Sequence, residues 1–119
     1  MTLEEIDRYC INLPGTSVRY PFDSNPTLRA WCIGRKMFAW TITDDLPISV
    51  QLKADPDLVP MLIANYTSIG PGYHMNKRHW ITVAADRCDV AMLQGLLEDA
   101  HNLAAKSLTR ADRIRLLGD

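Results

Sequence analysis

The sequence is poor in the features that mark exported, membrane-spanning or disulfide-bonded proteins. No apolar run approaches the ~20 residues that a membrane-spanning helix needs, and the first eight residues lack the basic-then-apolar order of a signal peptide. The cysteines Cys10, Cys32 and Cys88 are odd in number, widely spaced and form no Cys-x-x-Cys pair. We therefore expect a cytoplasmic protein whose cysteines are reduced and pack as small apolar side chains. A catalytic thiol stays open for any of the three.

Residues for catalysis or metal binding are also scarce. No serine or cysteine nucleophile with a partnering carboxylate is evident, and no glycine-rich phosphate-binding motif is present. Imidazole as a group titrates near neutrality, so His74 and His79 are the candidate acid and base, but no acidic residue near them in the sequence could orient either one. Their spacing also differs from the i, i+4 spacing of a helix-borne zinc pair. The sequence therefore predicts no enzyme activity, no metal site and no cofactor.

What the chain has is the composition of an ordinary globular domain. It has 119 residues, of which 47% are hydrophobic and 23% charged, enough for one core of useful size. We expect a single domain over residues 1–119, monomeric by default. The net charge is −1, so the chain as a whole is not drawn to polyanions. Charge is unevenly distributed, however, because residues 58–85 contain no Asp or Glu but include His74, Lys77, Arg78 and His79.

Hydrophobic periodicity and turn residues predict the elements. Thr2 and Glu5 form a capping-box pattern before an amphipathic helix that Pro14-Gly15 ends. Further helices are expected from about Asp57 and after a cap at Asp89, the latter with Val90 among its inward-facing residues. Residues 109–119 form either a short terminal helix or a frayed tail. Strands are expected at 19–22, 28–33, 36–43, 48–54 and 79–85. This order, with hairpin-length connections, predicts an α+β fold: a two-layer sandwich with a mainly antiparallel sheet and helices on one face.

Residues 48–54 give the clearest strand. Apolar residues alternate with Ser49, Gln51 and Lys53, which share the other face. Such alternation is typical of a sheet that is covered on one side and wet on the other. We therefore expect Lys53 on an open, solvated sheet face.

The most unusual segment is 71–80, with the sequence PGYHMNKRHW. Lys77 and Arg78 could neutralise phosphates, and arginine adds bidentate geometry. Tyr73 or Trp80 could stack on a base, and Asn76 could pair with a base edge.

Three further cations are expected near this segment, Lys53 on the open face and Arg35 and Lys36 at a hairpin tip. The candidate nucleic-acid-binding residues are therefore Arg35, Lys36, Lys53, His74, Asn76, Lys77, Arg78, His79 and Trp80. A plainer interpretation fits the same residues, with Trp80 in the core, both histidines satisfying backbone groups, and the cations solvated.

The chain resembles the MmcQ/YjbR-type bacterial proteins. The matching segments are Pro14-Gly15, Pro21-Phe22, Lys36-Met37-Phe38-Ala39, Leu52-Lys53-Ala54-Asp55-Pro56 and residues 71–83. The resemblance runs from the first helix to about Leu108, and residues 71–83 are its most specific part. Asp23 stands where many relatives have glycine after Pro-Phe.

The resemblance implies a CyaY-like α+β fold and DNA binding through a proposed double wing of β-hairpins. CyaY-like folds also include iron-binding frataxins, but Glu4, Glu5 and Asp7 on the first helix are too few for such an iron surface. From the resemblance and the residues of segment 71–80, we expect a small cytoplasmic protein that binds nucleic acid, namely DNA. The alternative is a protein-interaction or small anionic ligand-binding module without enzymatic activity. A deep apolar pocket beside His74 and Trp80 favours a ligand; a broad convex positive surface favours nucleic acid.

Overall fold

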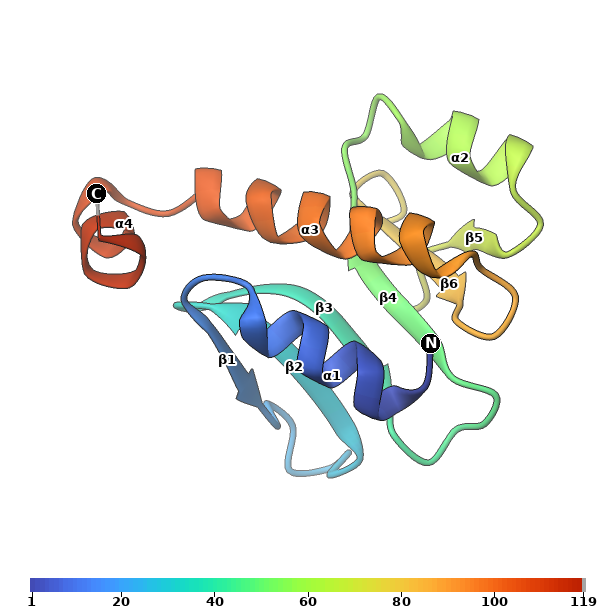
Figure 1. The fold of residues 1–119 in the computed structure, drawn as a ribbon, viewed down its shortest axis with the longest axis horizontal. Coiled ribbons are helices and arrows are strands. Elements are labelled where there is room, and N and C mark those ends of the chain that lie inside the picture. The colour runs from blue at the N-terminus through green and yellow to red at the C-terminus, as the bar shows by residue number, and fades with distance from the viewer. Residues whose placement is uncertain (119) are drawn as a thin grey trace.

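The computed structural model describes residues 1–118, which form one antiparallel sheet and helices that pack against it (Figure 1). The strands are β1 (Thr16–Arg19), β2 (Leu28–Ile33), β3 (Lys36–Ile42), β4 (Ser49–Lys53), β5 (Ile69–Pro71) and β6 (Trp80–Ala84), and the helices are α1 (Leu3–Asn12), α2 (Val59–Asn65), α3 (Val90–Lys106) and α4 (Arg110–Leu117). The strand order in the sheet is β1-β2-β3-β4-β6-β5, and every neighbouring pair is antiparallel. The predicted α+β fold with a mainly antiparallel sheet is confirmed.

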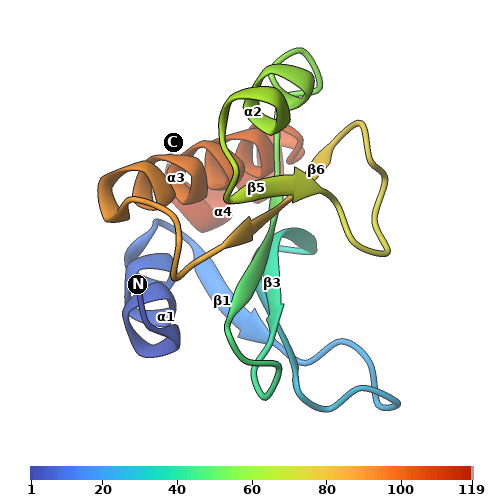
Figure 2. The same cartoon turned by 90° about the vertical axis from the view of Figure 1, so that its right-hand side faces the viewer.

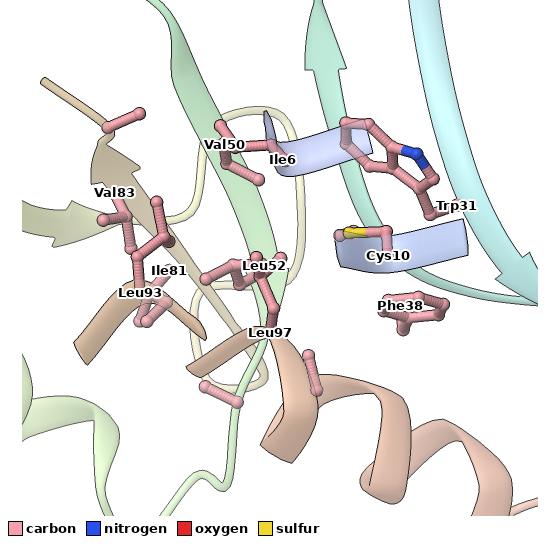
Figure 3. Packing of buried hydrophobic residues seen from close by; sticks show 14 of the residues in the cluster. Ile6, Cys10, Trp31, Phe38, Val50, Leu52, Ile81, Val83, Leu93 and Leu97 are labelled. Atoms are coloured by element: carbon pink, nitrogen blue, oxygen red, sulfur yellow. The ribbon is translucent and has the colours of Figure 1, made fainter. Parts of the chain in front are cut away.

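The main core lies between the sheet and the two helices that cover one face of it, α1 and α3 (Figures 1 and 3). Ile6 of α1 and Leu97 of α3 are fully buried there, against Trp31 of β2 and Phe38 of β3. Each such side chain contributes roughly 1.5–3 kcal/mol by leaving water. Helix α2 adds Val59 and Leu62 to the same core and contacts the edge strand β5.

Local signals in the sequence place the helix ends. The Thr2 hydroxyl accepts a hydrogen bond from the Glu5 amide, and the Glu5 carboxylate accepts one from the Thr2 amide, so the predicted capping box is present. The Asp89 carboxylate accepts from the Met92 amide at the start of α3. Residues 110–117 form a helix, which confirms the first of the two expectations for the terminal segment; Asp119 lies outside the described residues.

Three expectations about the elements are wrong. The first strand spans Thr16–Arg19 instead of 19–22, so residues 20–27 form a loop. Strand β5 was not expected, because Gly70 and Pro71 are typical of a turn; at the sheet edge, proline costs no ladder hydrogen bond. Val90 was expected to face inward along α3, but it is exposed.

Three further observations concern membrane-spanning helices, metal ligands and the cysteines. None of the helices within residues 1–118 has both the length and the apolar character needed to cross a bilayer. In the same part of the chain, no three His, Cys, Asp or Glu side chains gather where they could share a metal ion. The three cysteines are free and buried.

Candidate nucleic-acid interface

The sheet face that turns away from α1 and α3, here called the open face, carries a second, smaller apolar cluster. Its buried members are Leu28, Ala30, Cys32, Trp40 and Trp80, and Met37, Ile42 and Met75 pack against them. The expectation that this face is open and wet is therefore wrong where the cluster lies. Strand β2 explains the difference, because five of its six residues are buried and it contributes apolar side chains to both faces.

Two loops flank the open face. Residues 20–27 join β1 to β2, and residues 72–79 join β5 to β6; Figure 2 shows both projecting on the side away from the helices. Between them lies a hollow of about 490 Å³, here called the inter-loop hollow. It is lined by Phe22, Ser24, Asn25, Leu28, Met37, Trp40, Ile42, Asp45, Tyr73, His74 and Met75.

A second hollow of about 480 Å³ adjoins the first and is here called the Lys77 hollow. It is lined by Trp40, Ile42, Asp45, Ser49, Gln51, Gly70, Pro71, Gly72, Tyr73, Lys77 and Thr82. Trp40, Ile42, Asp45 and Tyr73 line both hollows. We call the two together the open-face groove.

The loop 72–79 is held in shape by its own contacts. A Cβ atom at Gly72 would lie 2.8 Å from the Cβ of Trp80 and 2.9 Å from its carbonyl oxygen, so glycine permits this close approach. Lys77 Nζ donates to the Gly72 carbonyl at 2.8 Å and thereby closes the loop. The Asn76 side-chain oxygen accepts from the Arg78 amide at 2.9 Å, and His74 has a left-handed φ of 55°.

Gln51 in β4 ties this loop to the sheet. Its Oε1 accepts from the Tyr73 amide at 2.9 Å and lies 2.8 Å from the Thr82 hydroxyl, which is also 2.7 Å from the Pro71 carbonyl. The hydroxyl has one proton and donates to one of these oxygens at a time. Gln51 is only 4% exposed. Sequence reasoning placed it on a wet face and missed this role, because no local pattern shows that a distant loop covers it.

The structure brings most of the predicted binding residues together. His74, Asn76, Lys77, Arg78 and His79 are all exposed on the loop 72–79. Lys53 lies at the end of β4, opposite Trp80 on β6, with Nζ 5.9 Å from the centre of the Trp80 ring. The ion pairs found within residues 1–118 are Arg29–Asp7 and Arg115–Asp112. The cations Lys53, Lys77 and Arg78 are therefore not neutralised by an acid within that part of the chain.

Trp80 is not an available stacking surface. It is 7% exposed and belongs to the apolar cluster of the open face. The exposed rings at the groove are instead those of Tyr73, 59% exposed, and Phe22, 51% exposed. The Tyr73 ring lies against that of His74, with the ring centres 4.0 Å apart.

Arg35 and Lys36 lie in a different region. They are exposed at the β2–β3 hairpin, where Gly34 lies against Leu116 of α4, far from the loop between β5 and β6 (Figure 1). The pKa of Asp112 in α4 is lowered chiefly by the hydrogen bond from Arg115, and the charge of Arg35 contributes to this shift. The expectation that these two cations extend the patch around Lys77 is therefore wrong.

Two charged residues at the open face were missed. Asp45, in the turn between β3 and β4, lines both hollows, so the groove contains a carboxylate although residues 58–85 contain none. Arg19 in β1 pairs with Ala30 and so shares the open face with it. The alternation of β1 could have indicated Arg19. No local signal could have indicated Asp45, because only the fold brings it to the groove.

The cysteines are poorly suited to nucleophilic chemistry. Burial raises the pKa of the Cys10 thiol to about 12 and also raises the pKa values of Cys32 and Cys88. A reactive cysteine needs a depressed pKa, because the thiolate is the nucleophile. The possibility of a catalytic thiol thus gains no support from the environments of these residues.

The chain has relatives in bacteria. A sequence model of the YjbR family matches residues 11–103. The chain is 33% identical over 114 residues to YbdF of Escherichia coli O157:H7, covering 95% of this chain and 92% of YbdF. It is 30% identical over 86 residues to YjbR of Escherichia coli K12, covering 72% of this chain and 71% of YjbR.

Solved structures agree with this relationship. The crystal structure of DR2400 from Deinococcus radiodurans superimposes with a TM-score of 0.84 at 30% identity, covering 96% of this chain and 86% of DR2400. A protein from Pseudomonas syringae gives a TM-score of 0.76 at 25% identity, covering 87% of this chain and 99% of that protein. The names of these relatives state no ligand and no activity. They establish fold and relationship, whereas function has to be argued from the groove.

Proposed function

The chain belongs to the YjbR family, and we propose that it is a non-enzymatic nucleic-acid-binding protein that takes its ligand in the open-face groove. The loop 72–79 supplies the phosphate contacts, and the exposed rings of Phe22 and Tyr73 supply stacking. The single observation that carries the proposal is the exposed, un-neutralised Lys77 in the lining of a groove with aromatic walls, with the exposed Arg78 next to it in the chain. Basic side chains that follow the backbone and aromatic rings that stack on bases are the usual means of binding single strands.

The salt dependence of binding follows from the number of cations. If Lys53, Lys77 and Arg78 engage phosphates, log K against log salt concentration should have a slope of roughly −2.1 on a single strand and −2.7 on duplex DNA. Loss of Lys77 and Arg78 should reduce the slope by roughly 1.4 on a single strand. It should also weaken binding by about 5- to 30-fold, equivalent to about 1–2 kcal/mol.

The experiment is a fluorescence-anisotropy titration of labelled DNA with the wild type and with the double variant Lys77→Ala/Arg78→Ala. The double variant Arg35→Ala/Lys36→Ala is the matched control, because it removes the same charge from exposed positions away from the groove. Only the first variant should lose affinity. Equal losses would show that binding depends on net charge alone, and a Kd weaker than ~10⁻⁴ M at low salt would contradict the proposal.

A small anionic ligand is the second candidate. The groove is concave, and each hollow falls within the roughly 300–1,000 Å³ of small-molecule sites. The inter-loop hollow lies beside His74 and is lined mainly by apolar and aromatic side chains. In that case a small phosphate-bearing compound would bind as tightly as a DNA strand.

A further inference from the structure

We propose that the open-face groove holds one unpaired nucleotide, with the base in the inter-loop hollow and the phosphate in the Lys77 hollow. The protein would then prefer single-stranded nucleic acid to duplex. This inference rests on the proposed function and adds the class of ligand. The juxtaposition that supports it is an aromatic-walled hollow that shares Trp40, Ile42, Asp45 and Tyr73 with a second hollow containing a lysine.

The inter-loop hollow suits a flat ring. Its floor is formed by apolar side chains of the sheet, including Leu28, Met37 and Trp40. Phe22 of the loop 20–27 and Tyr73 of the loop 72–79 both line it, and each has at least half of its surface exposed. Because the Tyr73 ring already lies against His74, less of its freedom is lost when a base stacks on it.

The hollow also offers polar groups for a base edge. Ser24, Asn25 and His74 line it, together with the carboxylate of Asp45. Asparagine and aspartate pair with base edges through their side-chain amide and carboxylate. The indole N–H of Trp40 is buried and has no hydrogen-bond acceptor within residues 1–118. Because this nitrogen is buried, the polar groups that a base edge can reach are those of Ser24, Asn25, His74 and Asp45.

The Lys77 hollow suits a phosphate. Lys77 Nζ uses one N–H on the Gly72 carbonyl and keeps two for a ligand. Ser49 and Thr82 add hydroxyl groups to the same lining. In a nucleotide, a sugar joins the base to the phosphate over a short distance. The two hollows share four lining residues, so they are adjacent to one another as the base and the phosphate are.

Shape is the reason for preferring an unpaired base. A paired base lies inside the helical stack, and an enzyme or binding protein reaches it only by taking it out, at the expense of stacking and pairing. The loops 20–27 and 72–79 both project on the side of the sheet away from the helices (Figure 2), so a duplex approaching this face would meet them before it reached the sheet. An unpaired base enters without that penalty.

The test compares a labelled 12-nucleotide strand of mixed sequence with the duplex that it forms with its complement, at one salt concentration. The single strand should bind about tenfold tighter. Phe22→Ala and Tyr73→Ala should each weaken binding of the strand by about fivefold or more, and by a larger factor than they weaken binding of the duplex. Tyr66→Ala is the matched control, since Tyr66 is exposed and lines neither hollow.

Each outcome has a distinct meaning. Equal affinity for strand and duplex would overturn the inference and leave the proposed function standing, whereas no binding to either would overturn both. Competition by dAMP distinguishes a free nucleotide from a nucleotide within a strand as the ligand. If dAMP binds as tightly as the strand, the ligand is a free nucleotide and the single-strand preference is overturned. If the strand binds at least about tenfold tighter than dAMP, the inference is supported.

Discussion

The close approach of Gly72 to Trp80 can be tested by a single substitution, Gly72→Ala. The added Cβ would lie 2.8 Å from the Trp80 Cβ, 2.9 Å from its carbonyl oxygen and 3.1 Å from its carbonyl carbon. Two of these three atoms are backbone atoms of β6, so the contact cannot be relieved by a side-chain rotation. Forcing an extra methyl into such a site typically costs 1–3 kcal/mol. We expect Gly72→Ala to lower the free energy of unfolding by roughly 2 kcal/mol.

The same change should weaken binding at the groove. The carbonyl of Gly72 accepts from Lys77, and the next residue donates its amide to Gln51. A shift of the backbone at Gly72 therefore moves the lysine and detaches the loop from β4. We expect the affinity of the variant for DNA to fall by about tenfold even under conditions where it is fully folded.

Urea unfolding followed by tryptophan fluorescence measures the first effect, and Gly70→Ala provides the control. Gly70 lies two residues away, in β5, and a Cβ there would meet no atom within 4 Å. Gly70→Ala should be neutral or stabilising by up to about 1 kcal/mol, because alanine restricts the unfolded chain. If both alanine variants are as stable as the wild type, the argument that glycine is required at 72 is refuted.

Three further predictions concern single residues. Asp45→Asn removes the carboxylate from the groove and should raise the affinity for DNA by about two- to fivefold at low salt in anisotropy titrations, whereas unchanged affinity would place the phosphates elsewhere. Gln51→Leu removes the acceptor of the Tyr73 amide and should cost about 1–3 kcal/mol in urea unfolding, whereas Ser49→Ala, at an exposed neighbour, should stay within about 0.5 kcal/mol. Burial raises the pKa of the Cys10 thiol from 9.0 to about 12, so the unfolded state releases this proton at a lower pH than the folded state does. The free energy of unfolding should therefore fall as the pH rises from 9 to about 12, by up to about 1.4 kcal/mol per pH unit. Cys10→Ala should make that fall less steep in urea titrations between pH 9 and 11, and an unchanged slope would contradict the assignment.

The parts of the fold that the sequence predicted well are those decided by local interactions. The capping box at Thr2, the cap at Asp89 and the strand 28–33 each depend on residues close together in the chain. Strand β5 was missed because its extended shape depends on pairing with β6, between Ile69–Pro71 and residues 81–83. Turn propensity at Gly70-Pro71 gave the opposite indication, and the long-range pairing overrode it.

The candidate site shows the same division. The composition of the segment predicted the exposed cations of residues 74–79. The alternation of the strand predicted the face on which Lys53 lies. The burial of Gln51 under the loop depends on contacts between distant segments. The position of Asp45 in the groove depends on such contacts as well. Strand β2 has apolar residues on both faces, whereas a strand that is exposed on one face alternates apolar and polar residues. This was the feature of the sequence that indicated a buried apolar cluster on the open face.

The central claim is that nucleic acid occupies the open-face groove, and amide chemical-shift mapping during titration with a 12-nucleotide strand tests it most directly. The account predicts that the largest shifts fall in residues 20–27 and 72–80 and in β4, with little change in α1, in α4 or at the β2–β3 hairpin. Shifts concentrated on the helices or at Arg35 and Lys36, or no shifts at all, would contradict it.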